Sequence, residues 1–439
     1  MDKNMLLEIL EEWNFWRQER STGKQRVSYL QKVEEYLQPN VIVSLIGVRR
    51  AGKSYVMKQV IANMIKNGVE SRNILYVNFE ERRFTSFSTT LLDEIFDVYV
   101  QTLEPTMTPF VFLDEIQNIP LWERWARSMH ELGKAKIVIS GSSANLLSGE
   151  LGTVLTGRHL DIFIFPLDFK EILAFQDIVL KDALDIVSKK TEIQKAFQEY
   201  FISGGFPEVV LTQEKKPLLL MYFDDIITKD IEKRYAVHEK AKLQALGKWY
   251  LSNISSKTTF NALKEMLEMS PNTVEKFTAY LEEAHLLFFL KRFSFKVKEQ
   301  EKAARKVYAI DVGLANSIGF SFSANKGKIA ENIVAITLRK KSKEDPAMEL
   351  YYWQDSSERE IDFVVKKGEQ IEQLIQVCWN PEEKKTKERE IRALLKASEE
   401  LGCESLLIIT ENKEGKEEVE WFGRKGSVHY IPLWKWLLS

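Results

Sequence analysis

Residues 41–54 read VIVSLIGVRRAGKS, an apolar and β-branched run that continues directly into the pattern G-x-x-x-x-G-K-S. The run predicts a buried strand, and the glycines after it let the backbone turn so that its N–H groups face a phosphate. The next stretch, SYVMKQVIANMI, repeats apolar residues at helical spacing and predicts a helix with its positive end at the same place. Strand, loop and helix in this order indicate a phosphate-binding loop rather than a chance glycine turn.

The polar positions of this loop are candidates for binding ATP and Mg²⁺. Gly47 and Gly52 permit the tight turn, and Arg50 lies between them as a further candidate contact to the nucleotide. We expect Lys53 to bring a positive charge to the phosphate oxygens. We expect the hydroxyl of Ser54 to bind Mg²⁺.

A second apolar run, PFVFLDEIQNIP at residues 109–120, ends in two adjacent carboxylates. In parallel-sheet folds such a strand brings its last residues to the edge where the phosphate loop lies. We expect Asp114 to hold Mg²⁺ and Glu115 to orient and deprotonate the water that attacks the γ-phosphate. A strand that ends in Asp-Glu is also typical of a solvated helix start, but its position downstream of the loop favours the catalytic interpretation.

A third strand is predicted at KIVISGSS, residues 136–143, which ends in small hydroxyl residues. Ser142 is therefore a candidate sensor of the γ-phosphate. A helix is expected next, over residues 144–157, followed directly by Arg158. A cation is favourable at a helix C-terminus without any further role, so this arginine has a purely structural interpretation.

Several stretches together resemble one group of proteins: GVRRAGKS (47–54), LDEIQNIPLWERW (113–125), the segment 140–173 and SGGFPEVV (203–210). They are similar to the prokaryotic AAA-type ATPases that carry a C-terminal domain of formerly unknown function. In ring-forming ATPases of the AAA type, an arginine at the place of Arg158 reaches the nucleotide of the neighbouring subunit. The resemblance thus implies a catalytic Arg158 and a homo-oligomer, beside the structural interpretation.

The resemblance also implies the architecture, an α/β chain with a P-loop parallel-sheet ATPase, a helical lid, a winged helix and a C-terminal α/β PD-(D/E)xK-like domain. At 439 residues the chain is too long for one core. The expected domains are N-terminal helices with the ATPase core (1–165), the lid (166–240), the winged helix (241–320) and the restriction-endonuclease-like domain (321–439).

Composition indicates a cytoplasmic protein without a membrane or metal-cluster role. The N-terminus lacks a basic segment followed by an apolar one, and no apolar run is long enough to span a bilayer. The two cysteines, Cys378 and Cys403, have no C-x-x-C spacing, which argues against a zinc site or a disulfide scaffold. A net charge of −2 gives no overall attraction to nucleic acid, so a DNA-binding surface must be local.

A local basic surface is predicted in the winged-helix region. Two helical stretches flank Ser270-Pro271, and two strand-like runs enclose residues 291–306, which hold seven Lys or Arg against two Glu. The candidate nucleic-acid contacts are Lys276, Lys296, Lys298, Arg305 and Lys306. The second helix also carries three glutamates, so docking on a protein partner stays open.

The C-terminal segment has the outline of a PD-(D/E)xK nuclease but lacks part of its chemistry. Such a site needs carboxylates around a divalent metal and a lysine that activates water. Glu331 and Asp362 are present, whereas Gln376 and Cys378 stand where Glu and Lys are required. We expect a degenerate site, because a neutral amide is a poor ligand for Mg²⁺.

These patterns favour a Mg²⁺-dependent ATPase that couples ATP hydrolysis to action on DNA through its C-terminal half. One alternative is a nucleotide-switched regulator of a protein partner without DNA. Another is an ATP-gated nuclease, which requires other residues to rescue the incomplete site. The DNA structure, the partner, the oligomeric state and the pathway do not follow from the sequence.

Overall fold

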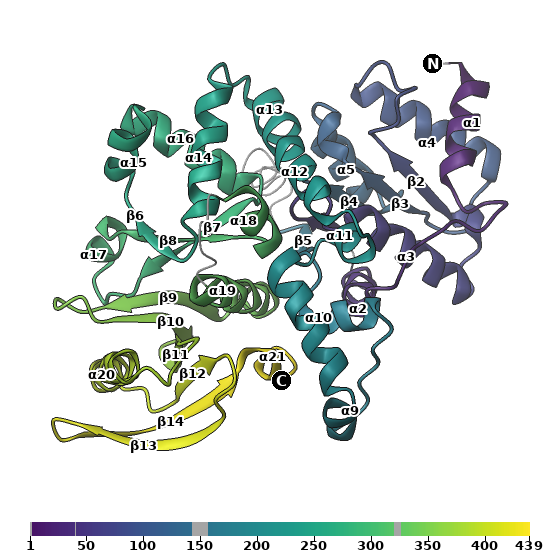
Figure 1. Ribbon diagram of the computed structural model, residues 1–439. Helices are drawn as coiled ribbons and strands as arrows, with labels where there is room; N and C mark the ends of the chain where they lie inside the picture. Colours follow the sequence, from purple (N-terminus) through teal and green to yellow (C-terminus); the bar gives the residue numbers. More distant parts are fainter. Residues whose placement is uncertain (1, 40, 143–156, 320–325) are drawn as a thin grey trace. The chain divides into compact units, whose positions relative to one another are not determined.

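The computed structural model describes residues 2–39, 41–142, 157–319 and 326–439 (Figure 1). The chain divides into two compact units. One consists of residues 1–165 with 283–285, and the other of residues 166–282 with 286–439. Neither the described helices of the first unit nor those of the second include one that is long and apolar enough to cross a bilayer.

A five-stranded parallel sheet forms the centre of the first unit. Its strands follow the order β2-β3-β4-β1-β5. Their bounds are β1 Ile42–Ile46, β2 Ile74–Asn78, β3 Phe110–Asp114, β4 Lys136–Gly141 and β5 His159–Phe163. All neighbouring pairs are parallel. The carboxyl ends of β1, β3 and β4 therefore lie side by side, as the sequence predicts for the phosphate loop and the two strands after it.

Helices cover this sheet because its central strands are apolar on both sides. Every residue of β1 and β3 is buried. The helices of the unit are α1 Lys3–Trp13, α2 Val27–Tyr36, α3 Lys53–Lys66, α4 Thr89–Leu103 and α5 Trp122–Glu131, with the short 3₁₀ turns η1 Ser71–Asn73 and η2 Ile116–Asn118. Side chains of α1, α4 and α5 share one apolar core with strand residues.

The N-terminal segment braces the edge of this sheet. Trp16 donates its indole N–H to the carbonyl of Ile74, at 2.8 Å. The side-chain amide of Asn14 donates to the carbonyl of Tyr76 at 2.9 Å and accepts from the N–H of the same residue at 2.7 Å. One amide side chain thus satisfies both backbone groups of an edge-strand residue.

The helices of the second unit lie before, between and after its strands. They are α8 Phe169–Phe175, α9 Ala183–Ser188, α10 Lys190–Ser203, α11 Pro207–Leu211, α12 Lys215–Asp225, the π-helix η3 Ile226–Glu232, α13 Lys233–Tyr235, α14 Lys240–Ser252, α15 Phe260–Leu267, α16 Pro271–Glu283, α17 Val297–Lys302, α18 Val312–Ile318, α19 Lys326–Glu344, α20 Lys384–Leu401 and α21 Leu433–Trp436. Ser270 accepts the N–H of Thr273 at 3.1 Å, so α16 begins with the cap that the sequence predicts.

A nine-stranded mixed sheet completes the second unit, in the order β13-β14-β12-β11-β10-β9-β7-β8-β6. The bounds are β6 Ser256–Thr258, β7 Leu287–Arg292, β8 Arg305–Ala309, β9 Met348–Gln354, β10 Glu360–Lys367, β11 Gln370–Val377, β12 Leu406–Thr410, β13 Gly415–Trp421 and β14 Arg424–Pro432. The predicted pair of strands around residues 291–306 is present as β7 and β8, which are antiparallel. The basic segment between them contains a short helix, α17.

The pair β7 and β8 does not stand apart from the C-terminal strands. Strand β7 pairs in parallel with β9, where Lys291 lies opposite Tyr351. The sheet is therefore continuous across residue 320, the boundary expected between two domains. The assignment of residues 166–240, 241–320 and 321–439 to separate domains stays a prediction.

The SGGFPEVV stretch packs against a buried aspartate. The N–H of Gly205 donates to Oδ2 of Asp311 at 2.6 Å, and its carbonyl accepts from Leu167 at 2.7 Å. A Cβ on Gly204 would lie 2.1 Å from Oδ1 of Asp311, and one on Gly205 would lie 2.1 Å from the carbonyl oxygen of Leu167. Only glycine fits at either position.

Candidate nucleotide-binding site

The loop between β1 and α3 has the backbone that a phosphate-binding loop requires. Gly47 and Gly52 have φ of 147° and 101°, a region that side chains rarely adopt. A Cβ on Gly47 would lie 2.3 Å from the carbonyl oxygen of Ile164. Arg50 also has positive φ, at 68°, and its side chain is exposed. The strand, loop and helix predicted from residues 41–64 are confirmed.

The first turn of α3 presents N–H groups to this loop. Its N-cap residue is Gly52, which has no side chain to cap them. Uncapped N–H groups at a helix N-terminus are a binding site for anions. Ser54 lies in the same turn and is half-buried.

Lys53 places its ammonium group over the loop. The side chain is buried, and Nζ donates to the carbonyls of Gly47 at 3.0 Å and Val48 at 3.2 Å. Nζ also lies 3.9 Å from Oε1 of Glu115. The cation expected to bind phosphate and the carboxylate expected to activate water are thus buried next to each other.

Asp114 is fully buried at the end of β3, and both of its carboxylate oxygens have hydroxyl donors. Tyr76 on β2 donates to Oδ2 at 2.7 Å, and Ser140 on β4 donates to Oδ1. Neighbouring strands on both sides therefore fix the orientation of this carboxylate. Neither Tyr76 nor Ser140 was among the residues singled out from the sequence.

Glu115 follows Asp114 in a left-handed backbone conformation, with φ of 55°. This conformation is unusual for a residue other than glycine, and such residues cluster at functional sites. The N–H of Glu115 donates to the hydroxyl of Ser140 at 3.0 Å, and Gln117 donates to its carboxylate. Burial raises the pKa of Glu115, and the nearby charge of Lys53 opposes this. A raised pKa suits a carboxylate that must accept a proton.

Ser142 is fully buried directly after β4, in the strand end between those of β3 and β1. It therefore lies at the edge of the sheet that also holds the loop. Residues 144–156 of the predicted helix lie outside the described residues.

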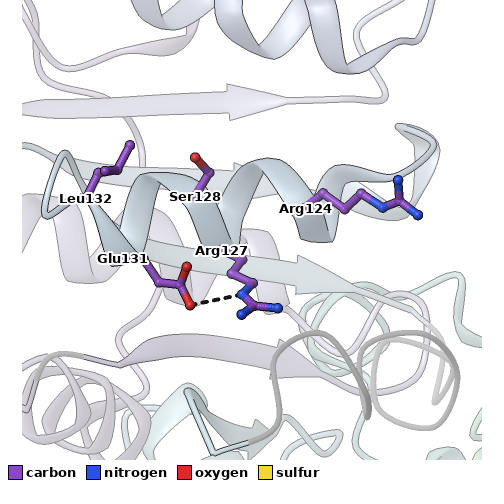
Figure 2. Close-up of a pocket in the computed structure, with 5 residues that line it drawn as sticks. All are labelled: Arg124, Arg127, Ser128, Glu131 and Leu132. Atoms are coloured by element: carbon purple, nitrogen blue, oxygen red, sulfur yellow. Dashed lines mark hydrogen bonds and ion pairs between the residues drawn. The ribbon is translucent and has the colours of Figure 1, made fainter.

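Arg158 lies directly before β5 and forms an ion pair with Glu131 of α5, at 3.0 Å. The same glutamate pairs with Arg127 at 2.9 Å. Figure 2 shows four residues of α5, among them Arg127 and Glu131, together with Leu132 directly after the helix; they line a hollow of about 410 Å³. Arg158 is thus held by a carboxylate of its own chain, while its side chain remains 39% exposed.

The candidate nuclease residues of the second unit come together around a lysine. Lys306 binds both Glu331 and Asp362, and a third carboxylate, Glu360, joins them. Gln376 accepts the N–H of Asp362 at 3.0 Å. Glu360 stands two residues before Asp362 on β10, and this alternation is the signal that could have identified it.

Gln376 and Cys378, at the place of the Glu-x-Lys motif, have surroundings that fit a structural role. The side-chain amide of Gln376 donates to Glu390 at 2.7 Å. Burial raises the pKa of the Cys378 thiol to about 12, so the thiol stays protonated at neutral pH. Neither side chain supplies the anion or the ammonium that this motif provides in a nuclease.

The candidate nucleic-acid contacts separate into two groups. Lys276, Lys296 and Lys298 are exposed and Arg305 is half-buried. Lys306 is 3% exposed and enclosed by carboxylates, so its interpretation as a contact to DNA phosphate is wrong. Lys306 belongs to a basic stretch of the sequence, and such a stretch does not show which of its side chains point inward.

Comparison with known proteins shows the family. Residues 39–173 match the AAA domain family, residues 194–325 match the domain of unknown function DUF8612, and residues 326–436 match the domain of unknown function DUF4143. The chain is 35% identical to the "Uncharacterized protein MJ1544" of Methanocaldococcus jannaschii over 93% of this chain and 90% of that protein. The chain belongs to this family of AAA-domain proteins. It is also 32% identical to an "Uncharacterized protein" of Haemophilus influenzae, over 79% of this chain and 84% of that protein.

Two solved structures are distantly similar to this AAA-domain protein. A Walker-type ATPase of Pyrococcus abyssi is 14% identical with a TM-score of 0.44, over 67% of this chain and 95% of that one. The Aeropyrum pernix ORC1 protein in complex with DNA is 14% identical with a TM-score of 0.32, over 71% of this chain and 94% of that one.

Proposed function

We propose that this protein is a Mg²⁺-dependent ATPase that couples ATP binding and hydrolysis to action on DNA through its C-terminal half. The observation that carries the proposal is the group formed by Lys53, Asp114 and Glu115, which are buried at the carboxyl ends of strands β1 and β3. Burial of a charged group costs free energy unless an opposite charge compensates it. Buried charged side chains gathered in one place therefore often mark a functional site.

Each residue has a role that its surroundings support. The backbone from Gly47 to Gly52 and the first turn of α3 bind phosphate, and Lys53 adds its charge. Ser54 and Asp114 would hold Mg²⁺, which when bound draws negative charge from the phosphate oxygens. Glu115 orients the attacking water and accepts its proton.

The accessory residues contribute to positioning. Ser142 is proposed to contact the γ-phosphate, and Arg50 to contact the nucleotide from the loop. Arg158 is proposed to act on the nucleotide of a neighbouring subunit, which requires it to leave Glu131. Its exposed and paired state is consistent with a side chain that changes partner on assembly.

We propose that DNA contacts lie on the winged-helix-like part of the second unit. Lys296 and Lys298 are exposed at the start of α17, and Lys276 is exposed on α16. Phosphate contacts release counterions, so each contact steepens the salt dependence of binding by nearly one unit of log-log slope. With a net charge of −2, the protein must obtain this attraction locally.

The test measures ATPase turnover without DNA and with duplex, single-stranded and branched DNA, at two salt concentrations. We expect stimulation by at least one DNA, weaker at high salt. The double variant Lys296→Glu with Lys298→Glu should lose this stimulation and keep the basal rate. The matched control, Lys181→Glu with Lys190→Glu, changes two lysines around α9 and should keep it. Basal turnover that no DNA alters, with equal DNA binding by both variants, contradicts the coupling.

One observation favours a protein partner as a second candidate. Phe295 and Val297 are 78% and 72% exposed next to the same lysines. Contiguous exposed apolar surface, rather than a single exposed apolar side chain, is typical of contact sites. Phe295→Ser should then abolish stimulation of the ATPase by the partner while DNA binding and basal turnover remain unchanged.

The nuclease alternative has the weakest support. The carboxylates of the second unit surround Lys306, and Gln376 and Cys378 lack the required charges. Incubation of the same DNA substrates with Mg²⁺ and ATP should give no nicked product.

A further inference from the structure

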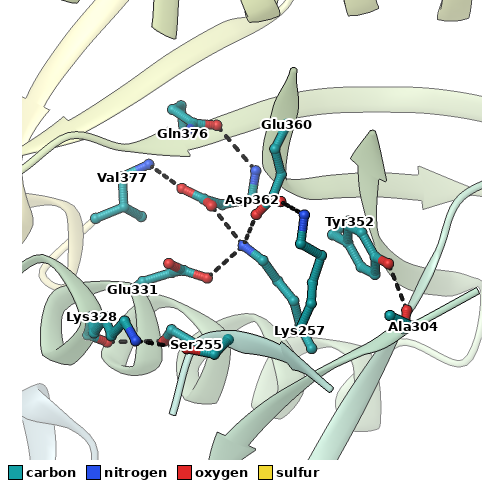
Figure 3. Close-up of polar contacts among 12 residues, drawn as sticks. Ser255, Lys257, Ala304, Lys328, Glu331, Tyr352, Glu360, Asp362, Gln376 and Val377 are labelled. Atoms are coloured by element: carbon teal, nitrogen blue, oxygen red, sulfur yellow. Dashed lines mark hydrogen bonds and ion pairs between the residues drawn. The ribbon is translucent and has the colours of Figure 1, made fainter. Parts of the chain in front are cut away.

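The ammonium group of Lys306 lies at the centre of three carboxylates in the second unit. Nζ is 2.9 Å from Oε1 of Glu331, 2.6 Å from Oε1 of Glu360 and 2.8 Å from Oδ1 of Asp362. An ammonium group has three N–H donors, and each has one carboxylate to receive it. Figure 3 shows the three labelled carboxylates turned toward one point between α19 and β10.

The chain brings these groups together from three separate elements. Lys306 comes from β8, Glu331 from α19, and Glu360 and Asp362 from one face of β10. The register between β10 and β9 shifts between Ile361 and Val364. Such an irregularity re-aims side chains, and here it lies beside the cluster.

The remaining contacts of the carboxylates are also occupied. Tyr308 donates to Oε1 of Glu331 at 2.8 Å, and the N–H of Val377 donates to Oδ2 of Asp362 at 2.9 Å. Lys257 pairs with Oε2 of Glu360 at 2.8 Å. Each of the three carboxylates therefore has at least one protein partner besides Lys306.

A divalent metal does not fit this cluster. Mg²⁺ requires about six oxygen ligands at about 2.0–2.1 Å, some of them water. The space between the carboxylates contains an ammonium group that is 3% exposed, which leaves no room for an ion with its waters. Throughout the described part of the chain, no group of three or more His, Cys, Asp or Glu is arranged to hold a metal.

We propose that Lys306 is the resident cation of this cluster and stands where an active nuclease of the PD-(D/E)xK type would bind its metal. The lysine makes this domain independent of metal and unable to activate water, so the domain serves as a binding or assembly platform. The proposal rests on the proposed kinship of this domain with that fold. It does not depend on ATP hydrolysis or DNA binding.

The test compares nucleotide-free full-length variants by thermal melting in EDTA or Mn²⁺, and by Mn²⁺ binding followed with electron paramagnetic resonance. Wild type should melt at the same temperature in both solutions. Lys306→Met should melt lower in EDTA, because three carboxylates lose their central cation. It should recover in Mn²⁺ and bind one more ion than wild type.

Two variants serve as references. Lys257→Met removes the outer cation of the same cluster and should gain no Mn²⁺ binding, because Lys306 remains. Lys306→Met with Asp362→Asn removes a cation and an anion together. It should melt closer to wild type than Lys306→Met in EDTA and gain no Mn²⁺ binding.

Three outcomes overturn the proposal. The first is Mn²⁺ binding by wild type that Asp362→Asn abolishes, since the metal then fits beside Lys306. The second is a folded Lys306→Met that behaves like wild type in both solutions. The third is a double variant that is as unfolded as Lys306→Met. The unbalanced charge of the carboxylates would then not explain the lower stability of Lys306→Met.

Discussion

The hydroxyl of Tyr76 donates a hydrogen bond of 2.7 Å to Oδ2 of Asp114, so the edge strand β2 fixes the carboxylate at the end of β3. Ser140 on β4 holds the other oxygen. Since β3 lies between these two strands, Asp114 is oriented from both sides. A ligand oriented in this way by surrounding hydrogen bonds is prepared to bind its ion without rearrangement.

Tyr76→Phe should therefore reduce ATPase activity as well as stability. It leaves a buried carboxylate oxygen without its donor, which costs about 1–3 kcal/mol in the free energy of unfolding. The matched control is Tyr99→Phe, which removes a 2.7 Å hydrogen bond to the carbonyl of Arg72. Urea unfolding should show losses for both variants, whereas the Mg²⁺ dependence of turnover should change only for Tyr76→Phe. An equal change in both would argue against a role of Tyr76 in positioning Asp114.

Lys53→Ala and Glu115→Gln should separate binding from hydrolysis. The first variant loses the positive charge that is expected to bind phosphate, so its affinity for ATP should fall. The second keeps that cation, so it should bind ATP while hydrolysis falls by roughly 10² to 10⁴. Binding of a fluorescent ATP analogue and phosphate release measure the two effects. Wild-type turnover by Glu115→Gln would remove Glu115 from the mechanism.

Arg158→Ala should lower turnover at every protein concentration and retain ATP affinity, if this arginine acts on a neighbouring subunit. Wild-type turnover should rise with concentration as subunits assemble. Arg127→Ala is the matched control because Arg127 pairs with the same Glu131. It should keep the wild-type concentration dependence. Activity that does not depend on concentration in a monomeric sample rules the arrangement out.

Stability should depend on pH through Asp311. Burial raises the pKa of this carboxyl to about 6, against about 3.9 in an unfolded chain. Because the folded pKa is the higher one, the contribution to stability is fully present below about pH 4 and is lost as the pH rises to about 6. The loss amounts to at most about 3 kcal/mol.

The readout is the difference between wild type and Asp311→Asn in urea unfolding across this range. The difference should change with pH, because asparagine does not titrate. Asp97→Asn, at an exposed site on α4, should give a curve parallel to that of wild type. Parallel curves for wild type and Asp311→Asn would show that Asp311 keeps an ordinary pKa.

Gly204→Ala should destabilise more than Gly402→Ala. Both glycines have positive φ, 73° and 66°, but ψ is −163° at Gly204 and 34° at Gly402, so only Gly402 has the left-handed helical conformation that other residues can adopt. A Cβ on Gly204 meets Asp311, whereas one on Gly402 has nothing within 4 Å. The Gly402 variant should cost about 1 kcal/mol, the usual penalty of a left-handed conformation. The additional loss in Gly204→Ala combines the clash with Asp311 and the less accessible backbone conformation of Gly204. Equal melting temperatures for the two variants would mean that the neighbouring segments yield without cost.

The phosphate loop and the strands beside it could be predicted from the sequence because their signals are local. An apolar run, its glycines and the following helix lie within residues 41–66, and Asp114 and Glu115 end a similar run. The parallel order of the strands then brings these ends together. Local patterns also predicted α16 with its cap at Ser270.

The partners of these residues could not be predicted, because they depend on contacts between distant segments. Tyr76 stands 38 residues before Asp114, and nothing in the run ILYVN shows that its hydroxyl points at a carboxylate. Lys306 belongs to a basic stretch, and charge along a sequence does not reveal which side of a strand is buried. Its partner Glu331 follows 25 residues later on a helix.

The side chain of Asn14 has a consequence for the behaviour of the chain in solution. Strand β2 is the outer strand of its sheet, and the unpaired backbone of such a strand is a template on which other chains can add. Asn14 occupies both backbone groups of Tyr76, and Trp16 occupies the carbonyl of Ile74. The N-terminal segment therefore covers the part of β2 on which another chain could add. Proteolytic removal of residues up to 20 should expose this edge and make the protein associate through it.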